Sequence, residues 1–213
     1  MNLQHHIKKP FVKICGQTHQ SATDNAASCG ASYLGFIFHP RSPRSITAKH
    51  AAEIRTVGVN RVGVFVKQKG SAICDIMQQA RLNYAQLHGN QTIDDAKLIG
   101  KERVIRVIWP ERHQSTASLQ AEIDQWAPHC AFLLLDAGQQ GGGHGKRIAL
   151  EQIKGIHFPK PWILAGGLDA DNVKDLIELC QPDGLDLNSG LEFSPGFKHT
   201  RNMLDAFKAL TIK

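Results

Sequence analysis

The sequence lacks the long apolar segments that would place it in or across a membrane. No run of apolar residues approaches the ~18 that a membrane-spanning helix requires. Residues 1–13 are polar and basic and contain no apolar stretch of the kind that a signal peptide carries. We therefore expect a cytoplasmic protein that makes no use of a membrane.

Cysteines are few and lack the spacing of a disulfide framework or a metal site. The chain has five, an odd number, and no two form a C-x-x-C pair. A disulfide-dense scaffold is thereby excluded, and a zinc site is not indicated. His5, His6 and His113 show no ligand spacing either. We predict no metal, and free thiols that are mostly buried packing residues.

The composition is that of one globular domain. Of 213 residues, 42% are hydrophobic and 21% are charged, which excludes collagen and low-complexity disorder. No linker interrupts the chain, so we expect a single domain over 1–213, with 1–10 as a loosely ordered tail. The net charge of +6 suits an anionic ligand. Because the basic residues are spread out and not interleaved with aromatics, we expect no nucleic-acid partner.

Short apolar runs alternate with helical patterns along the whole chain. Near-continuous apolar strands of this kind form parallel sheets whose outer face is covered by helices. Eight strand–helix units predict an α/β fold, a single closed (β/α)₈ TIM barrel. An open doubly wound sheet would need a G-x-G-x-x-G turn after the first strand, and residues 16–21 do not supply one. The expected strands are Phe11–Cys15, Tyr33–Phe38, Arg61–Val66, Tyr84–His88, Val104–Trp109, Ala131–Asp136, Trp162–Ala165 and Leu185–Asn188.

Helical spacing of apolar residues marks the segments between these strands. The clearest stripes predict helices over 22–29, 73–80, 173–180 and 203–210, with Ser71 as an N-cap of the second. Less regular stripes predict helices over 47–57, 92–100, 115–127 and 148–155.

Active sites of such barrels lie at the carboxyl ends of the strands, a rule that selects Cys15 and Asp136. Lys13 and Cys15 share one strand face, and a nearby ammonium would lower the pKa of the thiol and favour a thiolate base or nucleophile. A packed cysteine beside an exposed lysine is the alternative. Asp136 closes an apolar run ahead of a glycine-rich loop over 137–147. Partial burial would raise its pKa and suit a general acid, whereas a turn aspartate is the alternative.

Further polar and glycine residues occupy the same end of the predicted barrel. The glycines after the seventh and eighth strands fall where barrels bind phosphate through backbone N–H groups, although glycines also make ordinary turns. The loop after the second strand holds Arg41 and Arg44, and the guanidinium of Arg44 could bind a carboxylate or simply be solvated. Gln86 and His88 share a strand face as an inward polar pair, or His88 is purely structural. The phosphate candidates are Gly166, Gly167, Ser189 and Gly190.

Eight motifs in order along residues 12–207 resemble the phosphoribosylanthranilate isomerase family of tryptophan biosynthesis. They are VKICG, GFIFHPRSPR, RVGVFV, QLHG, LLLDA with its glycine-rich loop, ILAGGL, NSGLE and SPG. The resemblance implies a (β/α)₈ barrel that uses no cofactor. It also implies an Amadori rearrangement of N-(5'-phosphoribosyl)anthranilate to 1-(2-carboxyphenylamino)-1-deoxyribulose 5-phosphate, the third step from chorismate to tryptophan.

The resemblance also implies roles for individual residues. Asp136 would protonate the ribose ring oxygen, Cys15 would remove the C2′ proton, and Arg44 would orient the anthranilate carboxylate. His88 would contact the substrate, and the glycine loops would hold its phosphate. The expected partner is thus a small phosphorylated molecule, bound by a monomer or homodimer. The chain departs from the family pattern at the 141–146 loop, and at Asn188, where a serine is common.

Two alternatives remain at this stage. The first is the related histidine-pathway isomerase, or a form that accepts both substrates. That family is similar to a barrel with two catalytic aspartates, one of them on the first strand. This chain has Cys15 there, which argues against that alternative. A non-catalytic barrel that binds phosphate or nucleic acid would suit the positive charge, but the basic residues are spread along the chain and no basic run is interleaved with aromatics.

Overall fold

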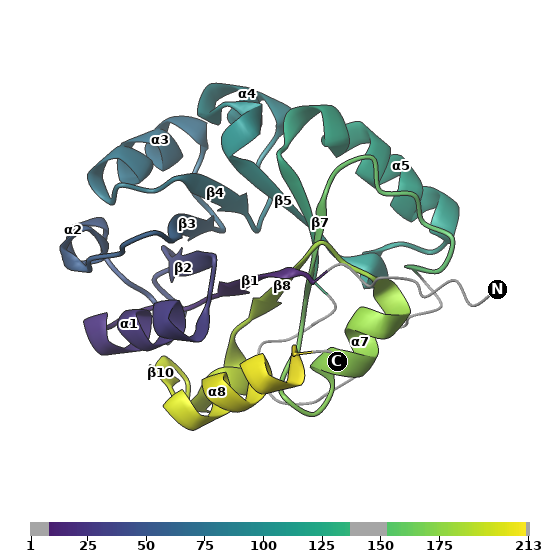
Figure 1. Ribbon diagram of the computed structural model, residues 1–213. Helices are drawn as coiled ribbons and strands as arrows, with labels where there is room; N and C mark the ends of the chain where they lie inside the picture. The colour runs from purple at the N-terminus through teal and green to yellow at the C-terminus, as the bar shows by residue number, and fades with distance from the viewer. Residues whose placement is uncertain (1–8, 137–152, 212–213) are drawn as a thin grey trace.

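The computed structural model describes residues 9–136 and 153–211, and within them eight parallel strands close into a barrel in chain order (Figure 1). The predicted (β/α)₈ class is therefore confirmed. Each strand lies within one or two residues of its expected bounds. The strands are β1 Phe11–Ile14, β2 Tyr33–Ile37, β3 Asn60–Phe65, β4 Tyr84–Leu87, β5 Val104–Ile108, β6 Phe132–Asp136, β7 Trp162–Ala165 and β8 Gly184–Leu187.

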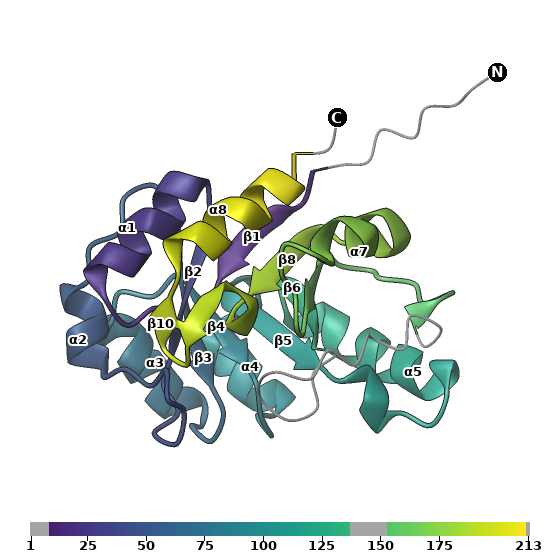
Figure 2. The same ribbon diagram turned by 90° about the horizontal axis from the view of Figure 1, so that it is seen from below.

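Helices cover the outside of the barrel, and a small hairpin follows β8 (Figures 1 and 2). The hairpin consists of β9 Glu192–Ser194 and β10 Phe197–Lys198, which pair antiparallel. The predicted helix over 148–155 falls mostly outside the described residues. Among those described, the α-helices are α1 Gln20–Cys29, α2 Ala48–Glu53, α3 Gly70–Gln79, α4 Ile93–Ile99, α5 Thr116–Trp126, α7 Val173–Cys180 and α8 Thr200–Ala209. None of them is long and apolar enough to cross a membrane.

The predicted N-cap of α3 is wrong. The helix begins at Gly70, so the N-cap is Lys69 and not Ser71. The side chain of Asp95 serves the helix start instead, because its Oδ1 accepts a hydrogen bond of 2.7 Å from the Gly70 backbone N–H. Asp95 belongs to the capping box of the next helix, α4, so one carboxylate satisfies two neighbouring helix starts.

Four aromatic side chains close the end of the barrel at which the strands begin. Phe11, Tyr33, Tyr84 and Phe132 come from four strands, and their ring centroids lie 5.0 to 6.1 Å apart. Gly184 of β8 leaves room for them, since a Cβ there would overlap the Phe11 ring. This aromatic floor fills one end, so polar groups inside the barrel are confined to its middle and its opposite end.

Strand alternation then determines which residues reach that opposite end. Side chains two apart face the same way, so the strand that turns Phe11 inward also turns Lys13 and Cys15 inward. The inner layer is otherwise largely apolar, and its buried members include Val62, Ile105, Val107, Leu134 and Ile163. By the same alternation His88, Trp109 and Asp136 point inward at the carboxyl ends of β4, β5 and β6.

Candidate active site

Cys15 directly follows β1 and is 4% exposed. Lys13, two residues earlier, is wholly buried, and its Nζ lies 2.7 Å from Oδ2 of Asp186 in β8. The two residues are register partners on adjacent strands, which brings the charges together. The prediction that Lys13 and Cys15 share a strand face is confirmed. That face is the inner one, so the alternative with an exposed lysine is wrong.

The pKa of the Cys15 thiol is raised, opposite to the predicted direction. Burial raises it most, because a thiolate loses its hydration; Lys13 lowers it, Asp186 raises it, and Lys198 lowers it by a smaller amount. The predicted direction of the pKa shift followed from the nearby cation alone, whereas burial of the thiol has the larger effect. At neutral pH the resting enzyme therefore holds Cys15 mainly as a thiol.

Gly35 of β2 makes room for this cluster, although it was not among the predicted site residues. A Cβ at this position would lie 2.7 Å from Sγ of Cys15 and 3.1 Å from Nζ of Lys13. Any larger side chain would displace the thiol or the ammonium. A glycine inside an apolar strand is the signal that was available, because it often marks a close approach.

His88 stands next to Asp136 on the inside of the barrel. Its Nε2 lies 3.8 Å from Oδ2 of Asp136, and its ring meets the Trp109 ring edge to face at 5.2 Å. Burial first, and then Lys13, Arg112 and other cations, lower the pKa of His88 to about 4. The imidazole is therefore neutral at physiological pH and gives Asp136 a polar neighbour without a positive charge.

This neutral histidine should make stability depend on pH. Between pH 6.5 and about 4 the unfolded chain protonates His88 while the folded chain does not, so stability is lost as pH falls through that window. Because the side chain is 30% exposed, we expect a loss of about 2 kcal/mol, less than the full linkage value. Urea unfolding at several pH values measures it.

His88→Gln should flatten that dependence, whereas His157→Gln, which changes an exposed histidine, should leave it as in the wild type. An unchanged slope in His88→Gln would show that the loss has another origin.

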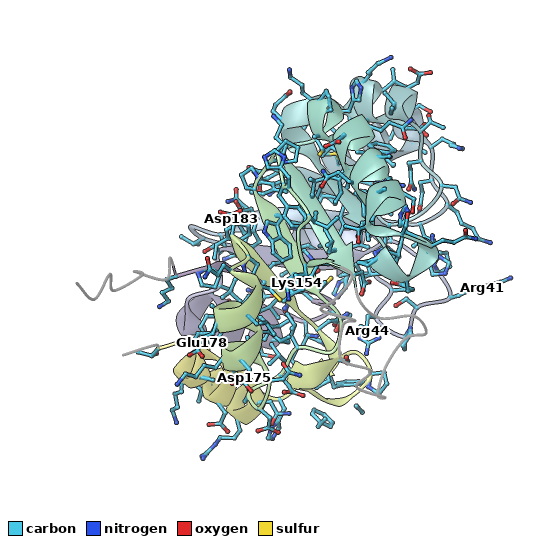
Figure 3. All side chains as sticks on the ribbon, turned by 90° about the vertical axis from the view of Figure 1, so that its right-hand side faces the viewer. Arg41, Arg44, Lys154, Asp175, Glu178 and Asp183 are labelled. Carbon is cyan, nitrogen blue, oxygen red and sulfur yellow. The ribbon has the colours of Figure 1, made fainter. Side chains whose placement is uncertain are left out.

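Arg44 binds a carboxylate of its own chain. Its Nε donates to both oxygens of Glu192 at 2.9 and 3.0 Å, and its Nη2 donates to Oε2 at 2.6 Å. Lys198 donates to the same carboxylate at 2.9 Å. Burial alone would raise the pKa of Glu192, but these cations lower it overall. Arg44 is 15% exposed, so the alternative of a freely solvated arginine is wrong; Arg41 of the same loop extends outward (Figure 3).

The glycine loops after β7 and β8 lie against each other. Gly166 and Gly167 have φ of +105° and +66°, a backbone that other residues rarely adopt. Ser189 begins a short 3₁₀ helix, Ser189–Leu191. Gly190 in that helix packs against the backbone of Leu168, and a Cβ on Gly190 would collide with the Leu168 carbonyl oxygen. The two loops are thus in contact, and their role in phosphate binding stays a prediction. The 137–147 loop lies outside the described residues.

Comparison with known proteins assigns the chain to a family. The N-(5'phosphoribosyl)anthranilate (PRA) isomerase family matches residues 12–209. The chain belongs to this family. The N-(5'-phosphoribosyl)anthranilate isomerase of Maridesulfovibrio salexigens is 45% identical over 94% of this chain and 98% of its own, and that of Desulfovibrio desulfuricans is 49% identical over 92% and 93%.

Solved structures agree with the sequence relatives. A phosphoribosyl anthranilate isomerase in complex with reduced 1-(o-carboxyphenylamino)-1-deoxyribulose 5-phosphate superposes with a TM-score of 0.81 at 27% identity, covering 94% of this chain and 98% of that one. The protein is thus an isomerase of tryptophan biosynthesis, as the motifs predicted.

Asn188 follows β8 at the position where the family resemblance led us to expect a serine. The Nζ of Lys198 donates to the side-chain oxygen of Asn188 at 2.8 Å and to its backbone carbonyl at 2.9 Å. The Asn188 side-chain oxygen also packs against Gly16, because a Cβ on Gly16 would lie only 2.8 Å from it. Asn188 therefore links the end of β8 to the residue that follows Cys15.

Proposed function

We propose that this isomerase works by acid–base catalysis, with Asp136 as the acid and Cys15 as the base. The reaction of its family is the Amadori rearrangement of N-(5'-phosphoribosyl)anthranilate to 1-(2-carboxyphenylamino)-1-deoxyribulose 5-phosphate. An aldose-to-ketose shift needs one acid, one base and an anchor for the anionic substrate. The observation that carries the proposal is that Cys15 and Asp136 both point into the barrel from strand ends, at β1 and β6.

Asp136 gives its proton to the ribose ring oxygen, the C1′–O bond breaks, and the anthranilate nitrogen supplies electrons to form the iminium. Only the fraction of Cys15 that has lost its proton to solvent acts as the base. This thiolate takes the C2′ proton, the electrons of the C2′–H bond pass into the enolamine, and the enolamine tautomerises to the ketone. The neutral imidazole of His88 lies beside Asp136 and is suited to hold a substrate hydroxyl there. Each step needs only an acid that gives a proton or a base that takes one, so we propose no cofactor.

Arg44 and the glycine loops are assigned to the two ends of the substrate. The hydrogen bonds of Arg44 to Glu192 use Nε and Nη2, and we assign Nη1 to the anthranilate carboxylate. The phosphate is assigned to the backbone N–H groups of Gly166, Gly167, Ser189 and Gly190. Their support is the contact between the two loops and the unusual φ values of the first two.

Arg44→Ala should raise KM by about 10- to 100-fold and change kcat far less, because a charge-assisted hydrogen bond to the bound carboxylate is lost in ground and transition states alike. Arg41→Ala, which changes the exposed arginine of the same loop, is the matched control and should keep the wild-type KM. Steady-state kinetics on both variants checks this. A normal KM in Arg44→Ala would remove Arg44 from the carboxylate site.

The activity itself is tested by following the loss of phosphoribosylanthranilate fluorescence with purified protein, for the wild type and Asp136→Asn together. The aminoimidazole substrate of the histidine pathway is the comparison. Turnover of that substrate as fast as the anthranilate one would contradict a single-substrate enzyme.

We also propose that the protein works in the cytoplasm, where thiols stay reduced. In support, all five cysteines lie among the described residues and are unpaired. A monomer or homodimer stays a prediction.

A further inference from the structure

A buried ion pair lies directly beneath the thiol that we assign as the base. Lys13 is wholly buried, Asp186 is nearly so, and Nζ lies 2.7 Å from Oδ2. The other carboxylate oxygen, Oδ1, is buried and has no hydrogen-bond partner among the described residues. Burying two charges in an apolar layer is costly, and a pair of apolar side chains in its place is often equally stable. The pair therefore calls for an explanation other than stability.

Asp186 keeps Lys13 charged. Burial alone would lower the pKa of the lysine, but the Coulombic attraction of Asp186, followed by that of Cys15 and by hydrogen bonds to both, raises it overall. Lys13 therefore remains an ammonium in a place without water. One of its protons is donated to Asp186. Its nitrogen and the Cys15 sulfur flank the same point beside β2, because a Cβ on Gly35 would lie 3.1 Å from the nitrogen and 2.7 Å from the sulfur.

Lys13 is better placed than the second ammonium near Cys15 to hydrogen-bond the sulfur. The charged groups that act on Cys15 are Lys13 from its own strand, Asp186 from β8 and Lys198 from β10. Lys198 makes three hydrogen bonds of 2.8 to 2.9 Å, two to Asn188 and one to Glu192, which use all three of its protons. Gly35 lets both the Lys13 nitrogen and the Cys15 sulfur approach β2.

We propose that Asp186 and Lys13 act as a positioning pair that holds an ammonium against Cys15 and stabilises its thiolate during proton abstraction. Asp186 holds Lys13 in place and keeps it protonated, and Lys13 donates a hydrogen bond to the sulfur. The pair does not touch the reacting carbon, and neither Lys13 nor Asp186 forms or breaks a covalent bond. This inference rests on the proposed role of Cys15 as the base.

The test is the titration of Cys15 in Lys13→Met, which keeps the volume of the side chain and removes its charge. Thiolate absorbance is recorded against pH, and the curve of the matching variant that also carries Cys15→Ser is subtracted. We expect the midpoint to rise by at least about one pH unit, a tenfold loss of thiolate at a given pH. The kcat should fall by at least about the same factor with KM little changed. A wild-type midpoint in folded Lys13→Met would overturn the proposal.

Two further variants keep the result decisive. Lys13→Met with Asp186→Leu removes both charges and avoids an unpaired buried carboxylate, so it stands in if the single variant fails to fold. Its upward shift should be smaller, because Asp186 raises the pKa of Cys15 and Lys13 lowers it more, and a wild-type midpoint overturns the proposal. Asp186→Asn should lower kcat by at least about tenfold, and wild-type kcat would remove Asp186 from the pair. Normal turnover in Cys15→Ala would instead overturn the proposed base, while the titration would still report on the pair.

Discussion

Cys15→Ala is expected to lower kcat by about 10²- to 10⁴-fold while KM stays near the wild-type value, because the change removes the group that takes the C2′ proton and leaves the substrate contacts in place. Steady-state kinetics that follow the fluorescence of the anthranilate substrate would measure both constants. A loss should be found at every pH, since alanine has no ionised form.

Cys130→Ala is the matched control for this result. Cys130 is also buried, at the start of the segment that leads into β6, and the change removes the same atom. That variant should keep wild-type turnover. If Cys15→Ala turned over as fast as Cys130→Ala, the thiol would have no part in the reaction.

Asp136→Asn is expected to lower kcat by a similar factor, about 10²- to 10⁴-fold. The amide has nearly the shape of the acid but cannot give a proton to the ribose ring oxygen, so ring opening should become limiting. Single-turnover measurements with excess enzyme would show a slow chemical step after normal binding.

The control for this variant is Asp183→Asn. Asp183 precedes β8, and its Oδ2 accepts a hydrogen bond of 3.1 Å from the backbone N–H of Trp162, the first residue of β7. It therefore lies at the opposite end of the strands from Asp136. Equal losses in the two variants would point to a general structural effect and against Asp136 as the acid.

The strands and the residues at their ends could be predicted because both depend on local pattern. Short apolar runs and two-residue alternation place Cys15, His88 and Asp136 at one end of a barrel without any knowledge of distant contacts. The direction of the Cys15 pKa shift could not be predicted in this way. It depends on how much water the folded barrel removes, and burial outweighs the lysine that the sequence shows nearby.

Partners that lie far apart in the sequence were also beyond prediction. Arg44 and Glu192 are 148 residues apart, and Lys13 and Asp186 are 173 residues apart. Only closure of the barrel between β8 and β1 makes the second pair adjacent. The N-cap prediction for α3 was wrong for the same reason, because the backbone N–H of Gly70 donates its hydrogen bond to Asp95 of another helix.

The ion pair between Arg44 and Glu192 has a consequence for substrate affinity. A long side chain that is free in solution loses about 0.5–1.5 kcal/mol of rotamer entropy when a ligand immobilises it. In this protein the guanidinium is already held at three hydrogen bonds before any substrate arrives. That entropy is lost when the chain folds. In the proposed carboxylate site the substrate would therefore meet a preorganised arginine, and ordering this side chain would not reduce the binding free energy.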